Sequence, residues 1–407
     1  SLRPADILLP DMNVDMKKWA VIACDQFTAQ PEYWKRVENY VQDAPSMLRL
    51  IYPEIYLNTD DRQAYTDRIA AIQNEMSAYL KDEVLKECVH QGYVLTVRQT
   101  SVGERIGLVA ELDLEKYDYH VGTDAPVRAT EATVKERIPV RVGIREGASL
   151  ESPHVMVLMD DPKKQLLEAL YEERMSLEKL YDTDLMEDGG HVTGYAVTGV
   201  YAERVSARLR QMEAACPGIF LAVGDGNHSL AAAKAYYEQL KAAHPDEDLS
   251  EHPARYALVE VVNLHSPALQ FEAIHRIVTG VHVEDLLSKM NAALHIKKEG
   301  KGQTFYTIYN GKKKKCVIER PTSKLTVGSL QRFLDGYLAH NGGKIDYIHG
   351  EEVVESLARE KDSIGFILPD MGKEELFPTV IHDGALPRKT FSMGHAQDKR
   401  YYTECRK

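Results

Sequence analysis

The sequence predicts an α+β fold, in which one interlocked N-terminal region is followed by a second, C-terminal α+β part. Short apolar runs typical of buried strands mix with amphipathic helical stretches, and the two kinds of segment do not alternate in regular βαβ order. No internal repeat or low-complexity segment is visible. A chain of 407 residues is long enough for two or three domain-sized cores.

The first half of the chain contains clear strand and helix patterns. Predicted strands cover residues 19–23, 93–97, 105–112 and 155–159, and the two middle ones form a pair around a Ser-Val-Gly turn. Predicted helices cover residues 31–50, 60–88 and 163–181. Pro31, near the start of the first helix, has the fixed φ and the missing N–H that suit a helix N-terminus.

The second half continues this mixture. Residues 195–200 fit either a strand or the start of a helix. Helices are predicted over 203–215, from 230 onward, and over 283–293, 325–340 and 353–359. Strands are predicted over 219–223, 256–264 and 363–368, and Asn310-Gly311 indicates a hairpin between 304–309 and 315–319. The residues from Asp383 onward are expected to be irregular.

A polar, proline-containing break from His244 to Pro253 is the best candidate for a domain boundary. It divides the chain into a core over residues 1–250 and a C-terminal α+β region over 251–407 that packs on it.

Composition and charge narrow the class of protein. The formal net charge of −12 argues against a nucleic-acid partner and against an anionic membrane surface. No run approaches the ~20 apolar residues of a membrane span, and residues 1–15 lack the pattern of a signal peptide. The five cysteines form no CxxC pair, so we expect a reduced, cytoplasmic protein.

The most informative stretch is Gly224-Asp225-Gly226-Asn227-His228-Ser229, which stands between an apolar strand and a strong helix former. A glycine turn lets a ligand approach the backbone closely, because no Cβ is in the way. The first turn of the following helix offers free N–H groups and the positive end of the helix dipole. This order therefore predicts a phosphate or carboxylate site, with a capped structural turn as the alternative.

Other well-known site motifs are missing. The sequence has no GxxxxGK[ST] loop, no HExxH or paired Cys/His set, and no GxSxG, which argues against a P-loop enzyme, a zinc site and an α/β-hydrolase. The glycine turn matches GxGxx, but the acids about 20 residues on lie in a loop before the next strand, which argues against a Rossmann site.

Several motifs together resemble a family of bacterial proteins, the domain of unknown function 1015. They occur in order along nearly the whole chain: Cys24-Asp25-Gln26-Phe27, Arg128-Ala129-Thr130-Glu131-Ala132-Thr133, Pro153-His154 through Asp160-Asp161-Pro162, Gly189-Gly190-His191 and Gly224 through Ser229. Where commoner members have Asp-Gly-His-His-Arg, this chain has Asn227 in place of a histidine and Ser229 in place of an arginine.

The resemblance implies a ParB/sulfiredoxin-like mixed sheet core and a relation to kinases of free serine. It implies that the loop from Gly224 to Ser229 (Gly224, Asp225, Gly226, Asn227, His228 and Ser229) holds the phosphates of ATP or ADP with Mg²⁺. It also implies that a phosphoryl group passes to a small hydroxylated substrate such as an amino acid.

On the residues themselves, His228, Asp25 and Glu131 are the candidate catalytic groups. His228 is able to donate to a phosphate or to act as an acid or base near pH 7. Asp25 follows an apolar strand, and its structural alternative is a cap at the strand end. Glu131 is a second candidate base, and its structural alternative is an exposed ion pair. Arg128 is a candidate phosphate partner, and Asp225 is a candidate Mg²⁺ ligand or a brace of the turn.

Three hypotheses about the function remain open. The first is a nucleotide-dependent phosphotransferase that acts on a small hydroxylated metabolite, and the second is a non-enzymatic nucleotide- or metabolite-binding regulator. A nucleic-acid-binding protein is the third, and the acidic balance disfavours it. The sequence leaves the oligomeric state open.

Overall fold

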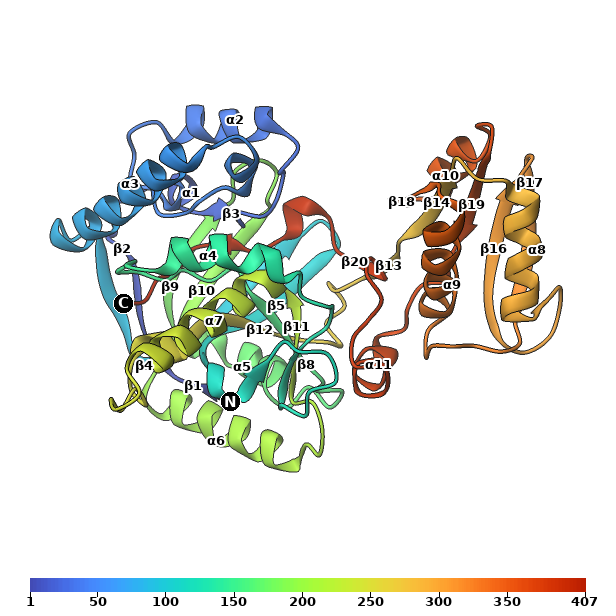
Figure 1. The fold of residues 1–407 in the computed structure, drawn as a ribbon. Helices are drawn as coiled ribbons and strands as arrows, with labels where there is room; N and C mark the ends of the chain where they lie inside the picture. Colours follow the sequence, from blue (N-terminus) through green and yellow to red (C-terminus); the bar gives the residue numbers. More distant parts are fainter. The chain divides into compact units, whose positions relative to one another are not determined.

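The computed structural model describes all residues from Ser1 to Lys407 and divides them into two compact units (Figure 1). The first unit comprises residues 1–269 and 394–407, and the second comprises residues 270–393. The expected boundary at residue 250 is therefore misplaced. The strand that follows the polar break, β12 (Tyr256–Asn263), pairs inside the main sheet of the first unit, and the C-terminal segment returns to the same unit.

The first unit is built on a mixed sheet of eleven strands, which confirms the predicted α+β class with a mixed sheet core. Its main path runs β6-β7-β11-β8-β12-β5-β4-β10-β9, while β1 pairs with β5 and β2 with β4. The strands other than β12 are β1 (Leu2–Arg3), β2 (Ala5–Pro10), β4 (Leu85–Thr100), β5 (Gly103–Asp113), β6 (Tyr117–Asp118), β7 (Val127–Ala129), β8 (Met156–Met159), β9 (Glu178–Asp184), β10 (His191–Val197) and β11 (Leu221–Asp225).

Two strand pairings in this sheet position the glycine turn that follows β11. β11 runs parallel to β7, with Val223 opposite Ala129, and antiparallel to β8. The carboxyl ends of β7 and β11 and the amino end of β8 therefore meet at one edge of the sheet. β8 in turn runs parallel to β12, which is buried along its whole length.

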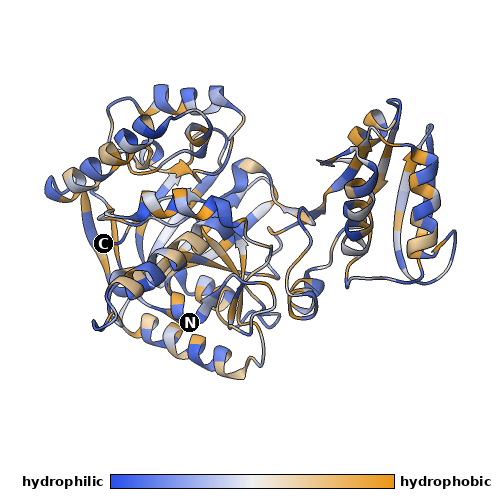
Figure 2. Cartoon of the chain, viewed as in Figure 1, coloured by the Kyte–Doolittle hydropathy of each residue, from blue (hydrophilic) through white to orange (hydrophobic).

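Seven α-helices belong to the first unit, and no helix of the structure is long and apolar enough to span a membrane. They are α1 (Met16–Trp19), α2 (Pro31–Val41), α3 (Arg62–Lys81), α4 (Ile138–Arg145), α5 (Leu167–Glu172), α6 (Gly199–Ala215) and α7 (Asn227–Ala243). α7 buries Leu230 and Tyr237 in the sheet core, and its small residues Ala231 and Ala232 pack against α4. Figure 2 shows apolar residues on the central strands and hydrophilic ones along the outer helices.

Some predicted helices are too long. The stretch 60–88 is helical only to Lys81, because residues 85–88 already pair with β2. The stretch 163–181 contains only α5 and a short 3-10 turn, and residues 178–184 form β9. Its helix-forming composition is overridden because this segment pairs with β10 and buries Tyr181 in the core.

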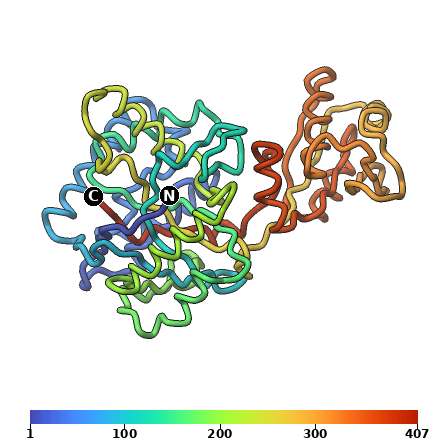
Figure 3. The backbone as a smooth tube through the Cα atoms, turned by 90° about the horizontal axis from the view of Figure 1, so that it is seen from below, coloured from blue at the N-terminus to red at the C-terminus, as the bar shows by residue number.

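The C-terminal segment is mostly irregular, as expected, but it is deeply buried rather than peripheral. β21 (Tyr401–Tyr402) pairs with β3 (Val21–Ile22), and Cys405 forms a bridge with Leu8. Figure 3 follows this red segment into the first unit beside the dark blue N-terminal strands. Thr403, Glu404 and Arg406 are all 5% exposed or less, so residues 401–406 are part of the core.

The second unit is α+β, with a six-stranded antiparallel sheet in the order β15-β17-β16-β19-β14-β18 and a separate pair of β13 and β20. The predicted hairpin about Asn310-Gly311 is present as β16 and β17. The elements are β13 (Phe271–Ala273), β14 (His275–Thr279), α8 (Val283–Leu294), β15 (Ile296–Lys297), β16 (Gln303–Tyr309), β17 (Lys312–Ile318), α9 (Thr326–Asn341), β18 (Lys344–Ile348), α10 (Glu351–Leu357), β19 (Ser363–Ile367), α11 (Leu376–Asp383) and β20 (Phe391–Met393).

Candidate functional site

The glycine turn joins the buried strand β11 directly to helix α7. Gly226 is the residue before the helix and has φ +82°, in the left-handed region that glycine adopts without strain. A Cβ on Gly226 would lie 3.1 Å from the Val155 Cα, and one on Gly224 would lie 2.8 Å from the Leu158 Cγ. No side chain caps α7, so its first N–H groups are available to a ligand or to solvent.

Replacing Gly226 by alanine is expected to destabilise the first unit by about 1–3 kcal/mol, because the alanine would be held in the left-handed region against Val155. Urea unfolding followed by tryptophan fluorescence measures this, since both tryptophans, Trp19 and Trp34, lie in the first unit. Gly122→Ala is the matched control, because Gly122 has φ +79° and nothing within 4 Å of a Cβ. Equal losses in the two variants would contradict the close contact at Gly226.

Candidate site residues of the 128–133 segment lie at the same edge of the sheet as the glycine turn. Thr130 donates from its hydroxyl to the Val223 carbonyl over 2.7 Å, which fixes the end of β7 beside the end of β11. Glu131 follows Thr130 and therefore lies at this edge, as Asp225 does. The Arg128 guanidinium is hydrogen-bonded locally: its Nε donates to the Ala125 carbonyl over 2.7 Å. Its predicted phosphate role stays a prediction.

His228 is held as a neutral acceptor. Its Nε2 accepts the Val134 N–H over 3.2 Å. Burial, together with the positive charges of Arg141 and Arg137, lowers the pKa of His228 to about 4, while Asp25 acts in the opposite direction. His228 is therefore uncharged near pH 7, and this geometry suits a positioning residue better than a proton carrier.

His228→Gln is expected to flatten the stability of the first unit between about pH 6.5 and pH 4. In that window an unfolded histidine binds a proton while the folded His228 does not, so the wild type loses stability as the pH falls. The difference between the two proteins should be on the order of 1 kcal/mol, because His228 is only half-buried and solvent screens part of the effect. Urea titrations at pH 7 and 4.5 test this, and parallel pH profiles would contradict it.

Two aspartates contribute charge near the turn. Asp225 accepts the Gly226 N–H over 3.1 Å and lies 3.3 Å from the Lys399 Nζ, which fits the bracing role. The three-residue cluster of potential metal ligands in the structure is Asp6, Glu87 and His90, which lies on other strands. Asp25 follows β3 and acts electrostatically on His228 and on Cys24. Burial raises the pKa of the Cys24 thiol, and Asp25 raises it further, so Cys24 is not an activated nucleophile.

A chain of hydrogen bonds runs from the first turn of α7 to the C-terminal segment. The Ser229 hydroxyl lies 2.9 Å from the His154 Nε2, and the Tyr402 hydroxyl lies 2.7 Å from the His154 Nδ1. The Tyr402 hydroxyl also accepts the Cys24 N–H over 3.2 Å. His154 and Tyr402 are both buried, so this chain fixes the loop from Gly224 to Ser229 against the turn after β3 that carries Cys24 and Asp25.

Two polar atoms beside the helix N-terminus are buried without a hydrogen-bond partner. They are the Asn227 side-chain oxygen and the Thr133 hydroxyl. Buried polar groups in folded proteins nearly always have a partner, which is protein, ordered water or a ligand. Both atoms are therefore available to a polar ligand or to water.

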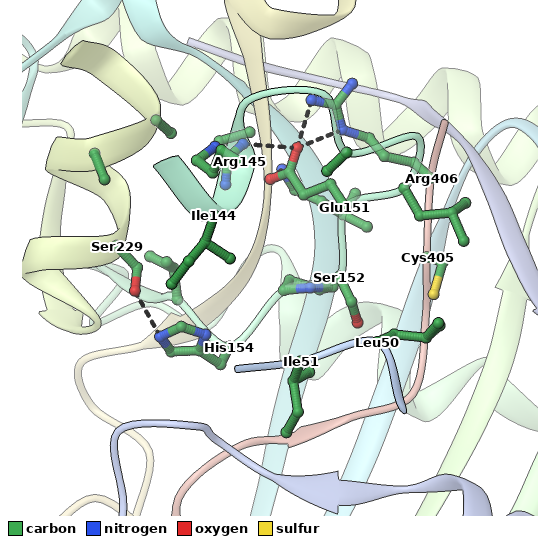
Figure 4. A pocket seen from close by; sticks show the side chains of 18 of the residues that line it. Leu50, Ile51, Ile144, Arg145, Glu151, Ser152, His154, Ser229, Cys405 and Arg406 are labelled. Atoms are coloured by element: carbon green, nitrogen blue, oxygen red, sulfur yellow. Dashed lines mark hydrogen bonds and ion pairs between the residues drawn. The ribbon is translucent and has the colours of Figure 1, made fainter. Parts of the chain in front are cut away.

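A cavity of about 370 Å³ adjoins the same loop. Ser229 and His154 line one part of it, and an ion-paired group of Arg145, Glu151 and Arg406 lines another (Figure 4). Apolar side chains complete its walls; among them are Met47, Leu50, Ile51, Met76, Ile144 and Leu150.

Sequence reasoning did not single out His154, Tyr402 or the arginines at the start of and within α4 as site residues. Arg137, Arg141 and Arg145 stand four residues apart, a spacing that places them on one face of a helix, and this signal was available. Tyr402 carried no such signal, because nothing in an irregular C-terminal stretch indicates that it returns to the core.

The fold and site define a protein with a mixed sheet core that carries a glycine turn, an uncapped helix N-terminus and an adjoining cavity. The family model of proteins of unknown function DUF1015 matches residues 8–337, so the chain belongs to that family, as the motifs predicted. No curated protein shows significant similarity to the sequence.

Solved structures with a similar arrangement are remote. A conserved hypothetical protein from Pyrococcus furiosus is 10% identical, with a TM-score of 0.36 over 72% of this chain and 93% of that one. A free serine kinase variant in complex with ADP is 10% identical, with a TM-score of 0.40 over 72% and 91%. SbnI from Staphylococcus aureus, in a C-terminally truncated form, is 11% identical, with a TM-score of 0.35 over 70% and 82%.

Proposed function

We propose that this protein is a nucleotide-dependent phosphotransferase that acts on a small hydroxylated molecule, with the nucleotide's phosphates at the N-terminus of α7. The observation that carries the proposal is the convergence of charge and free polar groups at that helix end. The uncapped N–H groups, the unpartnered Thr133 hydroxyl and two arginines that act on His228 all lie there. Such an assembly suits a multiply charged anion.

Phosphoryl transfer demands positioning, neutralisation of charge and a base beside the attacking hydroxyl. In this proposal the backbone of Gly226 to Ser229 holds phosphate oxygens, and Arg137 and Arg141 offset their charge. The substrate oxygen attacks the terminal phosphorus, the bond to the bridging oxygen breaks, and the nucleoside diphosphate leaves. The carboxylate of Asp25 takes the proton of the substrate hydroxyl.

Mg²⁺, expected with the nucleotide, usually binds through substrate phosphates and one or two carboxylates. Asp225 and Asp25 are the aspartates placed near the helix end, and Lys399 already competes for Asp225. His228 keeps a positioning role in this scheme, and Glu131 stays an alternative base at the same edge of the sheet.

The proposal is tested by incubating the protein with ATP and Mg²⁺ and a panel of small hydroxylated metabolites, and by measuring ADP. Production of ADP that depends on one acceptor is the expected result. Production that does not depend on any acceptor, or none with any nucleotide, would contradict the proposal.

A non-enzymatic binding protein is the second candidate, and one observation favours it. His228 is neutral and already accepts a hydrogen bond, so the loop presents no residue titrating near pH 7. Such a protein would bind a nucleotide, which raises its melting temperature, without consuming it.

A further inference from the structure

The cavity beside the loop has an unusual balance of charge for this acidic chain. Three arginines, Arg141, Arg145 and Arg406, line it against two glutamates, Glu54 and Glu151, and no other acidic side chain does so. Glu54 pairs with Arg141, whereas Glu151 is shared by Arg145 at 3.2 Å and Arg406 at 2.6 Å. Arg406 also lies 3.5 Å from Glu111, a carboxylate outside the cavity wall, so both glutamates that line the cavity are taken up by arginines.

Both α4 arginines also keep an unused donor. The Nε–H groups of Arg141 and Arg145 are buried and have no hydrogen-bond partner, and both residues line the cavity. A buried donor without an acceptor is costly, so the site favours a ligand that brings acceptor oxygens. Carboxylates match the planar fork of a guanidinium, which makes them the natural complement.

The remaining surroundings specify the rest of the ligand. The apolar walls formed by Leu50, Ile51 and Ile144 favour an aliphatic body. Ser229 and His154 offer hydrogen-bonding partners for a hydroxyl. Ser229 also belongs to the proposed phosphate site, and His154 supports that site. An ammonium group is disfavoured, because both glutamates that line the cavity are already paired with arginines. Burial alone would raise the pKa of Glu151, but Arg406 and Arg145 lower it, which keeps its carboxylate ionised and occupied.

We infer that this cavity binds the phosphate acceptor, and that the acceptor is a small hydroxy carboxylic acid with an aliphatic body rather than an amino acid. The carboxylate would lie against Arg145 and Arg141, and the hydroxyl would point toward Ser229 and the N-terminus of α7. The acceptor role rests on the proposed phosphotransferase function, whereas the ligand class rests on the cavity.

Calorimetric titration of the full chain without nucleotide tests the ligand class. The probes are 4-hydroxybutanoate, 6-hydroxyhexanoate and 8-hydroxyoctanoate, with 1,6-hexanediol and 6-aminohexan-1-ol as probes without the carboxylate. We expect at least one hydroxy acid to bind and the diol and amino alcohol to bind at least 10-fold more weakly. Equal binding of the diol, or no binding of any hydroxy acid, would overturn the inference.

Arg145→Met is the diagnostic variant, because it keeps the aliphatic stem while Glu151 stays paired with Arg406. It should weaken hydroxy acid binding by roughly 10- to 100-fold, as the loss of a hydrogen-bonded charge predicts. Arg145→Lys should weaken it less and serves if the methionine variant does not fold. The matched control is Arg204→Met, which removes an exposed arginine on α6. Unchanged binding in both Arg145 variants would overturn the inference.

Addition of ATP and Mg²⁺ to the bound hydroxy acid separates this inference from the proposed function. Production of ADP and of a phosphorylated acid supports both. Hydroxy acid binding without any consumption of ATP would contradict the phosphotransferase function and the acceptor role, while the ligand class would stand.

Discussion

Replacement of Arg400 by methionine is expected to destabilise the first unit by about 3–5 kcal/mol, because it leaves two buried carboxylates unpaired. The Arg400 Nε and Nη2 each donate over 2.6 Å, to Glu260 and to Glu404 respectively. Its Nη1 donates to the carbonyls of Pro153 and Tyr401 over 2.7 and 2.8 Å. All three charged side chains are at most 4% exposed, so water cannot replace these bonds.

The same arginine joins the C-terminal segment to the middle of the main sheet, since Glu260 lies on β12. Urea unfolding followed by tryptophan fluorescence gives the loss directly, and Arg204→Met provides the exposed control, which should change little. A loss below about 1 kcal/mol in Arg400→Met would mean that Glu260 and Glu404 find other partners and that the segment does not anchor the sheet.

Under the proposed phosphotransferase function, Asp25→Asn is expected to lower the turnover number by about 10²- to 10⁴-fold, the usual contribution of a general base. Asparagine keeps the shape of the side chain and removes its ability to take a proton. Nucleotide affinity should change little, because in the proposed site the helix end, Arg137 and Arg141 hold the phosphates, and Asp25 does not.

Asp43→Asn, at an exposed position after α2, is the matched control and should leave turnover unchanged. Turnover in Asp25→Asn within a few-fold of the wild type would remove Asp25 from the mechanism. In that case Glu131→Gln becomes the deciding variant, since Glu131 is the alternative carboxylate at the same edge of the sheet.

Local patterns predicted the parts of the fold that depend on local interactions. The glycine turn, the strand before it and the helix after it are present, as is the hairpin about Asn310-Gly311. The prediction failed where distant pairing decides the structure. Residues 178–184 have the composition of a helix and form a strand because β10 lies beside them.

The candidate site could be predicted only in part, for the same reason. The loop from Gly224 to Ser229 is contiguous in sequence, so its chemistry was visible. His154 reaches the loop from 75 residues away, and Tyr402 from the buried C-terminal segment contacts His154 in turn. A single sequence carries no signal for such contacts, whereas the cavity and the unpartnered arginine donors become apparent once the chain is folded.

The central claim is that the N-terminus of α7 holds the phosphates of a nucleotide. Amide NMR signals of Gly224, Gly226 and Asn227, in protein labelled with ¹⁵N-glycine and ¹⁵N-asparagine, test it most directly. We expect ATP and ADP with Mg²⁺ to shift these signals and adenosine to leave them in place. If saturating ATP leaves all three signals in place while signals elsewhere move, the phosphate site lies elsewhere and the claim is wrong.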